Sequence, residues 1–138
     1  MFGLGILKGT IIGLGIGIIA SIALKEACKN SNKNKATLGL LVAITAHKKS
    51  NELNIFLGAD GTHLLNTKNE GEVVGQGTGD LKIHLDYLKE NNIKLYVSGM
   101  SAKARGYDES LLNGFNAEFA MPDKLLDLST ESDTVLCY

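Results

Sequence analysis

The sequence contains little cysteine, proline or aromatic residue. Its 138 residues include two cysteines, one proline and no tryptophan, and 6% of them are aromatic. Cys28 and Cys137 are too far apart in sequence to form a CxxC pair, and they do not belong to a metal-ligand cluster, so we expect no metal site. A reduced, cytoplasmic environment is the simplest interpretation of so few thiols, and a disulfide between them is the alternative.

Neither sign of charge is in excess. The formal net charge is −1, which gives no reason to expect a nucleic acid as a partner. The length of the chain predicts one domain, with room for a short appendage. The 16 glycines and the single proline favour regular helices and strands separated by glycine-containing turns.

The first 24 residues are apolar, and Lys8 carries their only charge. A membrane-spanning helix needs about 20 such residues. On a helix, small residues at every fourth position form one stripe, which allows close helix packing in a membrane; here they are Gly5, Gly9, Gly13, Gly17 and Ser21. We therefore predict a glycine-rich apolar N-terminal helix over residues 1–24, followed by a domain over residues 25–138.

The lysines that follow this segment would place the domain in the cytoplasm, anchored to the inner face of the membrane. Two alternatives stay open. Residues 18–27 are rich enough in β-branched side chains to form a buried first strand, and periodicity alone does not separate the two structures. A cleaved signal peptide would also have this length.

Strand and helix signals alternate along the rest of the chain. After a polar break at residues 30–34, we predict helices over residues 36–49, 81–91, 108–113 and 122–131, and strands over residues 53–57, 93–97, 117–120 and 134–137. Residues 66–79 are expected to form a long loop. This alternation predicts a three-layer α/β/α domain with a mostly parallel sheet of four or five strands.

The spacing of apolar residues also predicts which helix faces are buried. In the first helix, Leu38, Leu41, Val42 and Thr45 recur at helical spacing. In the second, Leu81, Leu85 and Leu88 form the inner face, and Asp80 is the expected N-cap. Pro122 is expected at the first position of the last helix.

Two segments directly after strands carry the candidate site. One begins at Asp60, after the strand over residues 53–57, and the other begins at Ser98, after the strand over residues 93–97. In open α/β sheets, ligands bind at the carboxyl ends of the strands. The candidate ligand-binding residues are Asp60, His63, Ser98, Gly99, Met100, Ser101, Lys103 and Arg105.

Each candidate has a functional and a structural interpretation. A serine hydroxyl is inert without an adjacent base, so the two serines are expected to bond local backbone. Arg105, the only arginine, is suited to hold a carboxylate or phosphate, and a salt bridge at the surface or between subunits is equally compatible. Asp60 either orients His63 as an acid–base pair or caps a turn, and the turn is favoured.

Residues 75–79 (GQGTG) precede a helix and resemble a phosphate cradle, but they lack the Walker lysine and follow no strand. A flexible loop is the favoured interpretation, and no cofactor is expected.

Five segments resemble the DsrE/DsrF-like family in their order along the chain. They are Lys35–Leu40, Ile55–Gly61, Tyr96–Gly106, Ala117–Pro122 and Asp133–Leu136. The resemblance covers roughly residue 30 to the end. It implies a compact α/β/α domain that usually forms homo-oligomers. It also implies sulfur transfer in those members that carry a cysteine in the loop within the third segment, Tyr96–Gly106.

The chain departs from this pattern at two places. Ser98 and Ser101 occupy the loop where active members carry the cysteine. Family members also open with a strand and a short polar turn, a place taken here by the end of the apolar run and residues 25–28. That run either supplies the first strand or the domain lacks it.

Three hypotheses follow from the residues and the resemblance. The favoured one is a binding and assembly module without the loop cysteine, homo-oligomeric, tethered to a membrane, with a small anionic or sulfur-containing ligand. The first alternative is a sulfur carrier or sulfurtransferase that uses Cys28, the only candidate thiol near the predicted pocket. The second is a structural protein assembled through its glycine-rich helix. Whether the chain is an enzyme stays open, and Cys137 is expected to be a small buried hydrophobic residue.

Overall fold

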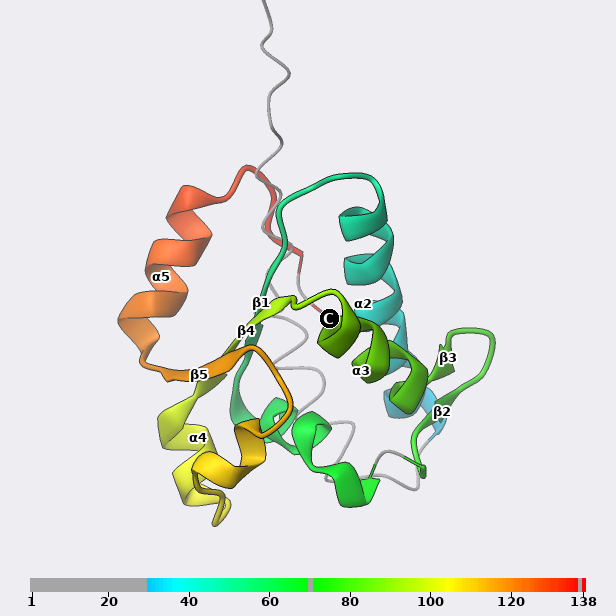
Figure 1. Cartoon of the computed structure of the whole chain (residues 1–138), viewed down its shortest axis with the longest axis horizontal. Helices are drawn as coiled ribbons and strands as arrows, with labels where there is room; N and C mark the ends of the chain where they lie inside the picture. Colours follow the sequence, from blue (N-terminus) through cyan, green and yellow to red (C-terminus); the bar gives the residue numbers. More distant parts are fainter. Residues whose placement is uncertain (1–29, 70, 137) are drawn as a thin grey trace, which may run out of the picture.

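A three-stranded parallel sheet forms the centre of the protein. The computed structural model describes residues 30–69, 71–136 and 138. The strands are β1 (Asn54–Leu57), β4 (Lys94–Ser98) and β5 (Ala117–Ala120), in the order β1-β4-β5 (Figure 1). Ile55 is in register with Leu95, and Leu95 with Ala117. The predicted α/β class with a parallel sheet is confirmed.

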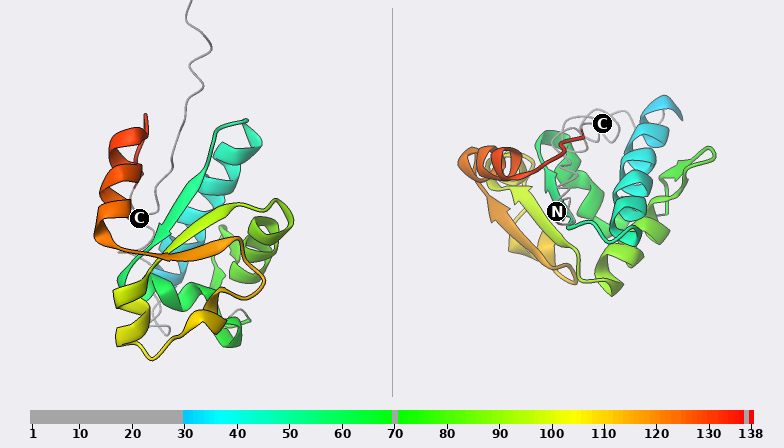
Figure 2. Two further views of the ribbon diagram at one scale, coloured as in Figure 1. Left: turned by 60° about the vertical axis from the view of Figure 1, so that its left-hand side comes forward. Right: turned by 90° about the horizontal axis from the view of Figure 1, so that it is seen from above.

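Helices cover both faces of this sheet. The helices α2 (Asn30–Lys48) and α3 (Leu81–Glu90) lie on one face, and α5 (Pro122–Glu131) lies on the other (Figure 2). Successive strand side chains point to opposite faces. Ile55 and Leu57 therefore belong to the larger core, whereas Phe56 packs with Tyr96 and Leu128 in a smaller core under α5. This is the predicted three-layer arrangement.

The second and last predicted helices form as the sequence indicates. Leu81, Leu85 and Leu88 of α3 are at most 2% exposed, so the leucine spacing identified the buried face correctly. Pro122 is the first residue of α5. Its fixed φ suits that position, and its missing N–H has no helical partner there. Asp80 occupies the N-cap position of α3, but among the described residues its side chain makes no capping bond.

The prediction for α2 is wrong in two respects. The helix begins at Asn30, so the expected polar break at residues 30–34 is part of it. Its buried face contains Ala36, Leu40 and Ala43, whereas Leu38 and Leu41 are 39% and 36% exposed. Apolar residues occur all round this helix between residues 36 and 46, so the sequence pattern did not determine which side faces the sheet.

The expected loop over residues 66–79 contains regular structure. It includes the 3-10 helix η2 (Thr67–Asn69) and an antiparallel hairpin formed by β2 (Val74–Gly75) and β3 (Gly79–Asp80). Gly77 and Gly79 have φ values of 78° and 87°, which glycine adopts without a steric penalty. The GQGTG sequence therefore forms a hairpin turn together with one strand residue on each side, where an irregular loop was expected.

Among the described residues the sheet has three strands, where four or five were expected. Residues 134–136 form no strand, although one was predicted over residues 134–137. Leu136 instead packs against the larger core from irregular backbone. The predicted apolar helix over residues 1–24, Cys28 and Cys137 lie outside the described residues. None of the helices that the structure describes is both long and apolar enough to cross a membrane.

Candidate functional site

The carboxyl ends of β1 and β4 lead into two short helices that contact each other. The 3-10 helix η1 (Ala59–Leu65) follows β1, and α4 (Gly99–Ala104) follows β4. The Ala59 N–H donates a hydrogen bond of 2.9 Å to the Ser101 Oγ atom, which links the two helices directly. The structure therefore brings together the two segments that the sequence identified.

The segment after β4 is a helix, where a loop was expected. Ser98 is its N-cap, and its Oγ atom accepts a hydrogen bond of 3.3 Å from the Ser101 N–H. Small polar residues at this position satisfy a backbone donor that would otherwise have no partner. Ser98 therefore bonds local backbone, as the structural interpretation predicted, whereas the Ser101 hydroxyl bonds the backbone of η1 at Ala59. Gly99, Met100 and Lys103 belong to the same helix, and Met100 is 60% exposed.

Arg105 pairs with Asp60 of the same chain. Its Nε atom donates to Asp60 Oδ1 over 2.5 Å, and its Nη2 atom forms an ion pair with the same oxygen. Its Nη1 atom donates to the Ser101 carbonyl over 3.0 Å. The side chains of Arg105 and Asp60 are 26% and 14% exposed. Of the two interpretations of Arg105, the structure shows a salt bridge, formed within one chain. An anion at Arg105 would have to compete with Asp60.

His63 pairs with Tyr107. Its Nδ1 atom lies 2.5 Å from the Tyr107 hydroxyl, and the Asn66 side-chain amide donates to the same hydroxyl over 3.2 Å. Burial lowers the pKa of His63 below its usual value; the Asp60 charge raises it and the Arg105 charge lowers it. The neutral imidazole is therefore favoured, and its tautomer determines whether Nδ1 or the Tyr107 hydroxyl donates in this hydrogen bond. The alternative Asp60–His63 pair does not form, because Asp60 bonds Arg105 and His63 bonds Tyr107. Asp60 lies in the first turn of η1, as the favoured interpretation had it, but the N-cap position is Gly58 and no side chain among the described residues caps it.

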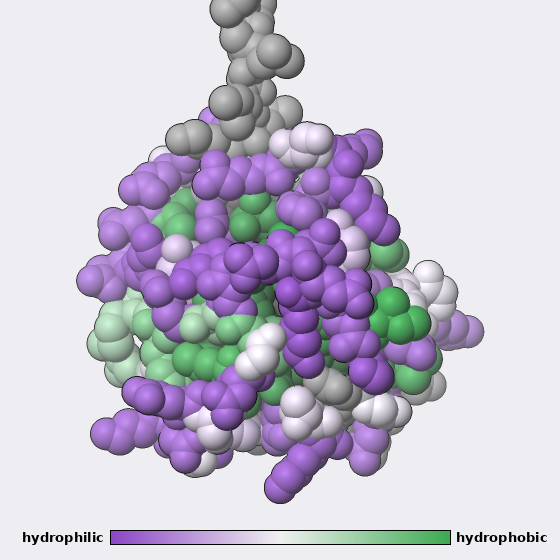
Figure 3. Space-filling view, viewed as in Figure 1, coloured by the Kyte–Doolittle hydropathy of each residue, from purple (hydrophilic) through white to green (hydrophobic). Residues whose placement is uncertain are grey.

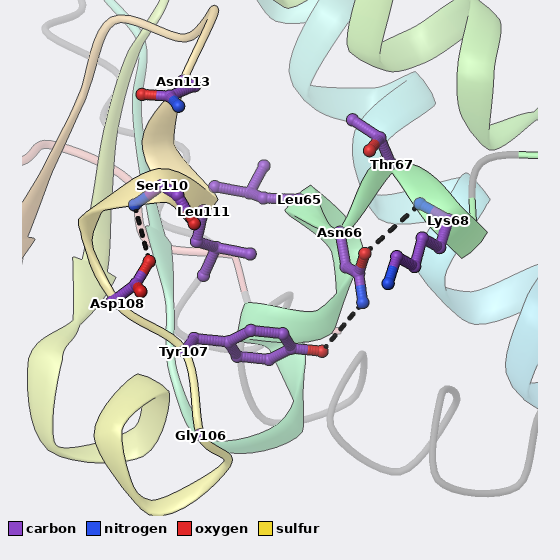
Figure 4. A pocket seen from close by; sticks show the side chains of 10 residues that line it. All are labelled: Leu65, Asn66, Thr67, Lys68, Gly106, Tyr107, Asp108, Ser110, Leu111 and Asn113. Atoms are coloured by element: carbon purple, nitrogen blue, oxygen red, sulfur yellow. Dashed lines mark hydrogen bonds between the residues drawn. The ribbon is translucent and has the colours of Figure 1, made fainter.

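A pocket of about 460 Å³ lies beside Tyr107, which is one of its lining residues. It is formed between the end of η1, η2, and the segment from Gly106 through the 3-10 helix η3 (Glu109–Leu112). Leu65 and Leu111 supply apolar surface, and Asn66, Lys68 and Tyr107 gather on one side (Figure 4). The residues predicted to bind a ligand do not line this pocket. The His63–Tyr107 bond connects the two regions.

Tyr107 and Lys68 were not identified from the sequence. Tyr107 follows Gly106, whose φ of 77° turns the chain after α4, but a lone tyrosine after a basic turn has no distinguishing pattern. Lys68 was assigned to a loop. No three potential metal-ligating side chains come together within the described part of the chain.

Comparison with known proteins identifies one family. The model of the DsrE/DsrF-like family matches residues 19–138. The matched range begins inside the segment predicted as a separate apolar helix, and it includes Cys28. No curated protein sequence matches the chain.

Proposed function

Because the chain belongs to the DsrE/DsrF-like family, we propose that it is a binding and assembly module of the sulfur-relay type. In this proposal Ser98 and Ser101 stand where active members carry a cysteine, and their role is structural. The ligand is a small anionic or sulfur-containing molecule bound near the carboxyl edge of the sheet.

The hydrogen bonding of the two serines carries this proposal. Ser98 Oγ accepts from the Ser101 N–H, and Ser101 Oγ accepts from the Ala59 N–H. A serine becomes a nucleophile only when a base removes its proton. His63 is a candidate base on η1, the helix that contacts α4, and its Nδ1 atom is bonded to Tyr107. The arrangement therefore favours a structural role for the two serines at the edge of a binding site over a role as nucleophiles.

Exposed apolar side chains support the assembly part of the proposal. Leu38 and Leu41 lie one turn apart on the outer face of α2, and Met100 and Met121 follow the adjacent strands β4 and β5. Figure 3 shows hydrophobic surface near β5 and again near the β2–β3 hairpin. Contiguous apolar surface marks association sites, and in this proposal these side chains contribute to such a surface. Sedimentation of the full chain should give a homo-oligomer; a monomer at all concentrations would contradict this part.

The tether is proposed from the sequence of residues 1–24, which would anchor the domain to the inner face of a membrane. Fractionation of the full chain tests it. Release from membranes only by detergent is the expected result, and full-length protein in the aqueous fraction would contradict it.

Treatment with inorganic polysulfide tests the absence of sulfur-carrier chemistry. A reactive thiolate attacks a polysulfide, takes one sulfur atom as a persulfide and releases a polysulfide shorter by one sulfur. We expect the full chain to gain no stoichiometric sulfur in intact-mass measurements. A Ser101→Cys variant, which places a thiol on α4, is the positive comparison.

One observation favours a second candidate function. Cys28 lies inside the range matched by the family model, so it belongs to the domain's sequence and is a candidate sulfur carrier. Stoichiometric loading of one sulfur that is abolished by Cys28→Ser and retained in Cys137→Ser would establish this function and overturn the favoured one.

A further inference from the structure

We propose that the pocket beside Tyr107 binds a small aliphatic monocarboxylate, with its charge against Lys68 and Tyr107 and its apolar part on Leu65 and Leu111. This inference rests on the proposed binding function and names the class of ligand. The site is distinct from the serines of α4 and from the Asp60–Arg105 pair.

Lys68 supplies the positive charge. It lies two residues after Asn66, and its backbone N–H donates to the Asn66 Oδ1 atom over 3.2 Å. This bond positions the backbone of Lys68 beside the pocket. Its ammonium group has no hydrogen-bond or ion-pair partner within the described residues. Figure 4 shows this side chain on the same side of the pocket as the Asn66 amide and the Tyr107 hydroxyl. An ammonium group in this position is suited to an anion.

Tyr107 and Asn66 supply neutral donors next to that charge. Asn66 uses one amide N–H for the Tyr107 hydroxyl, and its second makes no hydrogen bond in the part of the chain that the structure describes. The Tyr107 hydroxyl bonds to His63 Nδ1. When the neutral imidazole carries its hydrogen on Nδ1, it donates to the phenol oxygen, and the Tyr107 O–H is then directed to a ligand. In this tautomer Lys68, Asn66 and Tyr107 offer three donors to one carboxylate.

Asp108 limits the charge of the ligand. It lines the pocket on the other side from Lys68. Hydrogen bonds from Ser110 hold the pKa of Asp108 below its usual value, so this carboxylate is ionised at neutral pH. A second negative charge on the ligand would be repelled there. Leu65 and Leu111 line the pocket between Asp108 and Lys68 (Figure 4), and their apolar side chains favour an aliphatic group there.

Titration of the full chain with isovalerate tests the inference, with amide chemical shifts as the readout. Isovaleramide has the same shape without the charge, and succinate adds a second charge. We expect saturable shifts with isovalerate around residues 65–68 and 107–111, and binding at least about tenfold weaker for both analogues. Lys68→Met should lower the isovalerate affinity by about tenfold or more. Lys49→Met is the matched control. Lys49 is an exposed lysine just after the C-terminal end of α2 and does not line the pocket, so this change should leave binding unchanged.

Tyr107→Phe separates recognition from folding. It removes the hydroxyl and keeps the ring, and we expect weaker isovalerate binding with amide shifts unchanged away from the pocket. Equal binding of the amide and the carboxylate, or an unchanged affinity in Lys68→Met, would overturn the proposed ligand class, as would the absence of saturable shifts. These results are independent of the polysulfide test. Sulfur loading on a thiol with isovalerate still bound would refute the proposed function and leave the carboxylate site in place.

Discussion

The backbone of Gly75 lies against Thr37 so closely that a Cβ atom on Gly75 would lie 2.0 Å from the Thr37 Oγ1 atom. The same Cβ would lie 2.0 Å from Thr78 Oγ1, and the two threonine hydroxyls are 2.5 Å apart. The β2–β3 hairpin therefore packs its backbone directly on α2. Thr37 is fully buried at this contact, and the glycine leaves room for its hydroxyl.

Gly75→Ala should destabilise the protein by about 1–3 kcal/mol, because the added methyl group has to displace two hydrogen-bonded threonines. Gly71→Ala is the matched control, since a Cβ at Gly71 has no atom within 4 Å, and its effect should be within about 0.5 kcal/mol. Urea unfolding of both variants measures the difference. Equal stabilities would show that the hairpin separates from α2 without cost.

Leu85→Ala should lower the free energy of unfolding by about 2–5 kcal/mol. Leu85 is 1% exposed and belongs to the core between α3 and the sheet. On the same helix, Ile83 is 63% exposed, so Ile83→Ala removes a side chain of the same volume from solvent-facing surface. Chemical denaturation should therefore separate the two variants clearly. A negligible loss for Leu85→Ala would refute the packing of α3.

Ser98→Ala should preserve the fold and cost about 0.5–2 kcal/mol, because the N-cap bond to the Ser101 N–H is lost. Asp80→Ala is the comparison at an N-cap whose side chain makes no capping bond among the described residues, and we expect a smaller loss there. Thermal unfolding of the two variants measures the contrast. A larger loss for Asp80→Ala would mean that the Ser98 bond contributes little to α4.

Local signals predicted the parts of the fold that local chemistry determines. The bounds of β5 and α5 follow from a short apolar strand and a proline at the first helical position, and the buried face of α3 from its leucine spacing. The orientation of α2 was not predictable, because apolar residues surround it. The hairpin strands are two residues each, too short to show a periodic pattern. Thr134 and Val135 carry β-branched side chains, but their strand propensity did not make residues 134–136 a strand.

The candidate site was predictable at the level of segments only. Strand ends determined that residues near Asp60 and Ser98 meet at one edge of the sheet. Which side chains pair within that edge depends on tertiary geometry: Asp60 bonds Arg105, and His63 bonds Tyr107, each across more than 40 positions in sequence. The pocket between residues 65–68 and 106–113 depends on the same tertiary geometry and was therefore not predictable from the sequence.

Acidification should weaken the folded state through His63. Its pKa in the folded protein lies below the usual value of 6.5, mainly because it is buried. Between those two pKa values the unfolded chain binds more protons, so stability falls as pH decreases from 6.5 towards the folded pKa. Urea unfolding between about pH 8 and pH 5 should show a steeper loss for the wild type than for His63→Gln, which does not titrate in this range. Parallel curves would contradict a lowered pKa.

The Asp60–Arg105 pair should contribute more to stability than a surface ion pair, because both side chains are largely shielded from solvent. A double-mutant cycle with Asp60→Asn and Arg105→Met should give a coupling energy of about 1–2 kcal/mol. Lys82 and Asp86 of α3 form the control pair, at 2.9 Å and with side chains 59% and 41% exposed. Their cycle should give about 0.3–0.5 kcal/mol.

Salt separates the two cycles further. The screening length falls from about 10 Å at 0.1 M ionic strength to about 3 Å at 1 M, which is near the separation of an exposed ion pair, and charges shielded by protein are screened much less. Raising the salt concentration should therefore remove most of the Lys82–Asp86 coupling and leave most of the Asp60–Arg105 coupling. Equal loss of both would show that Arg105 reaches solvent in the native state, and its guanidinium would then be accessible to an anionic ligand at the edge of the sheet.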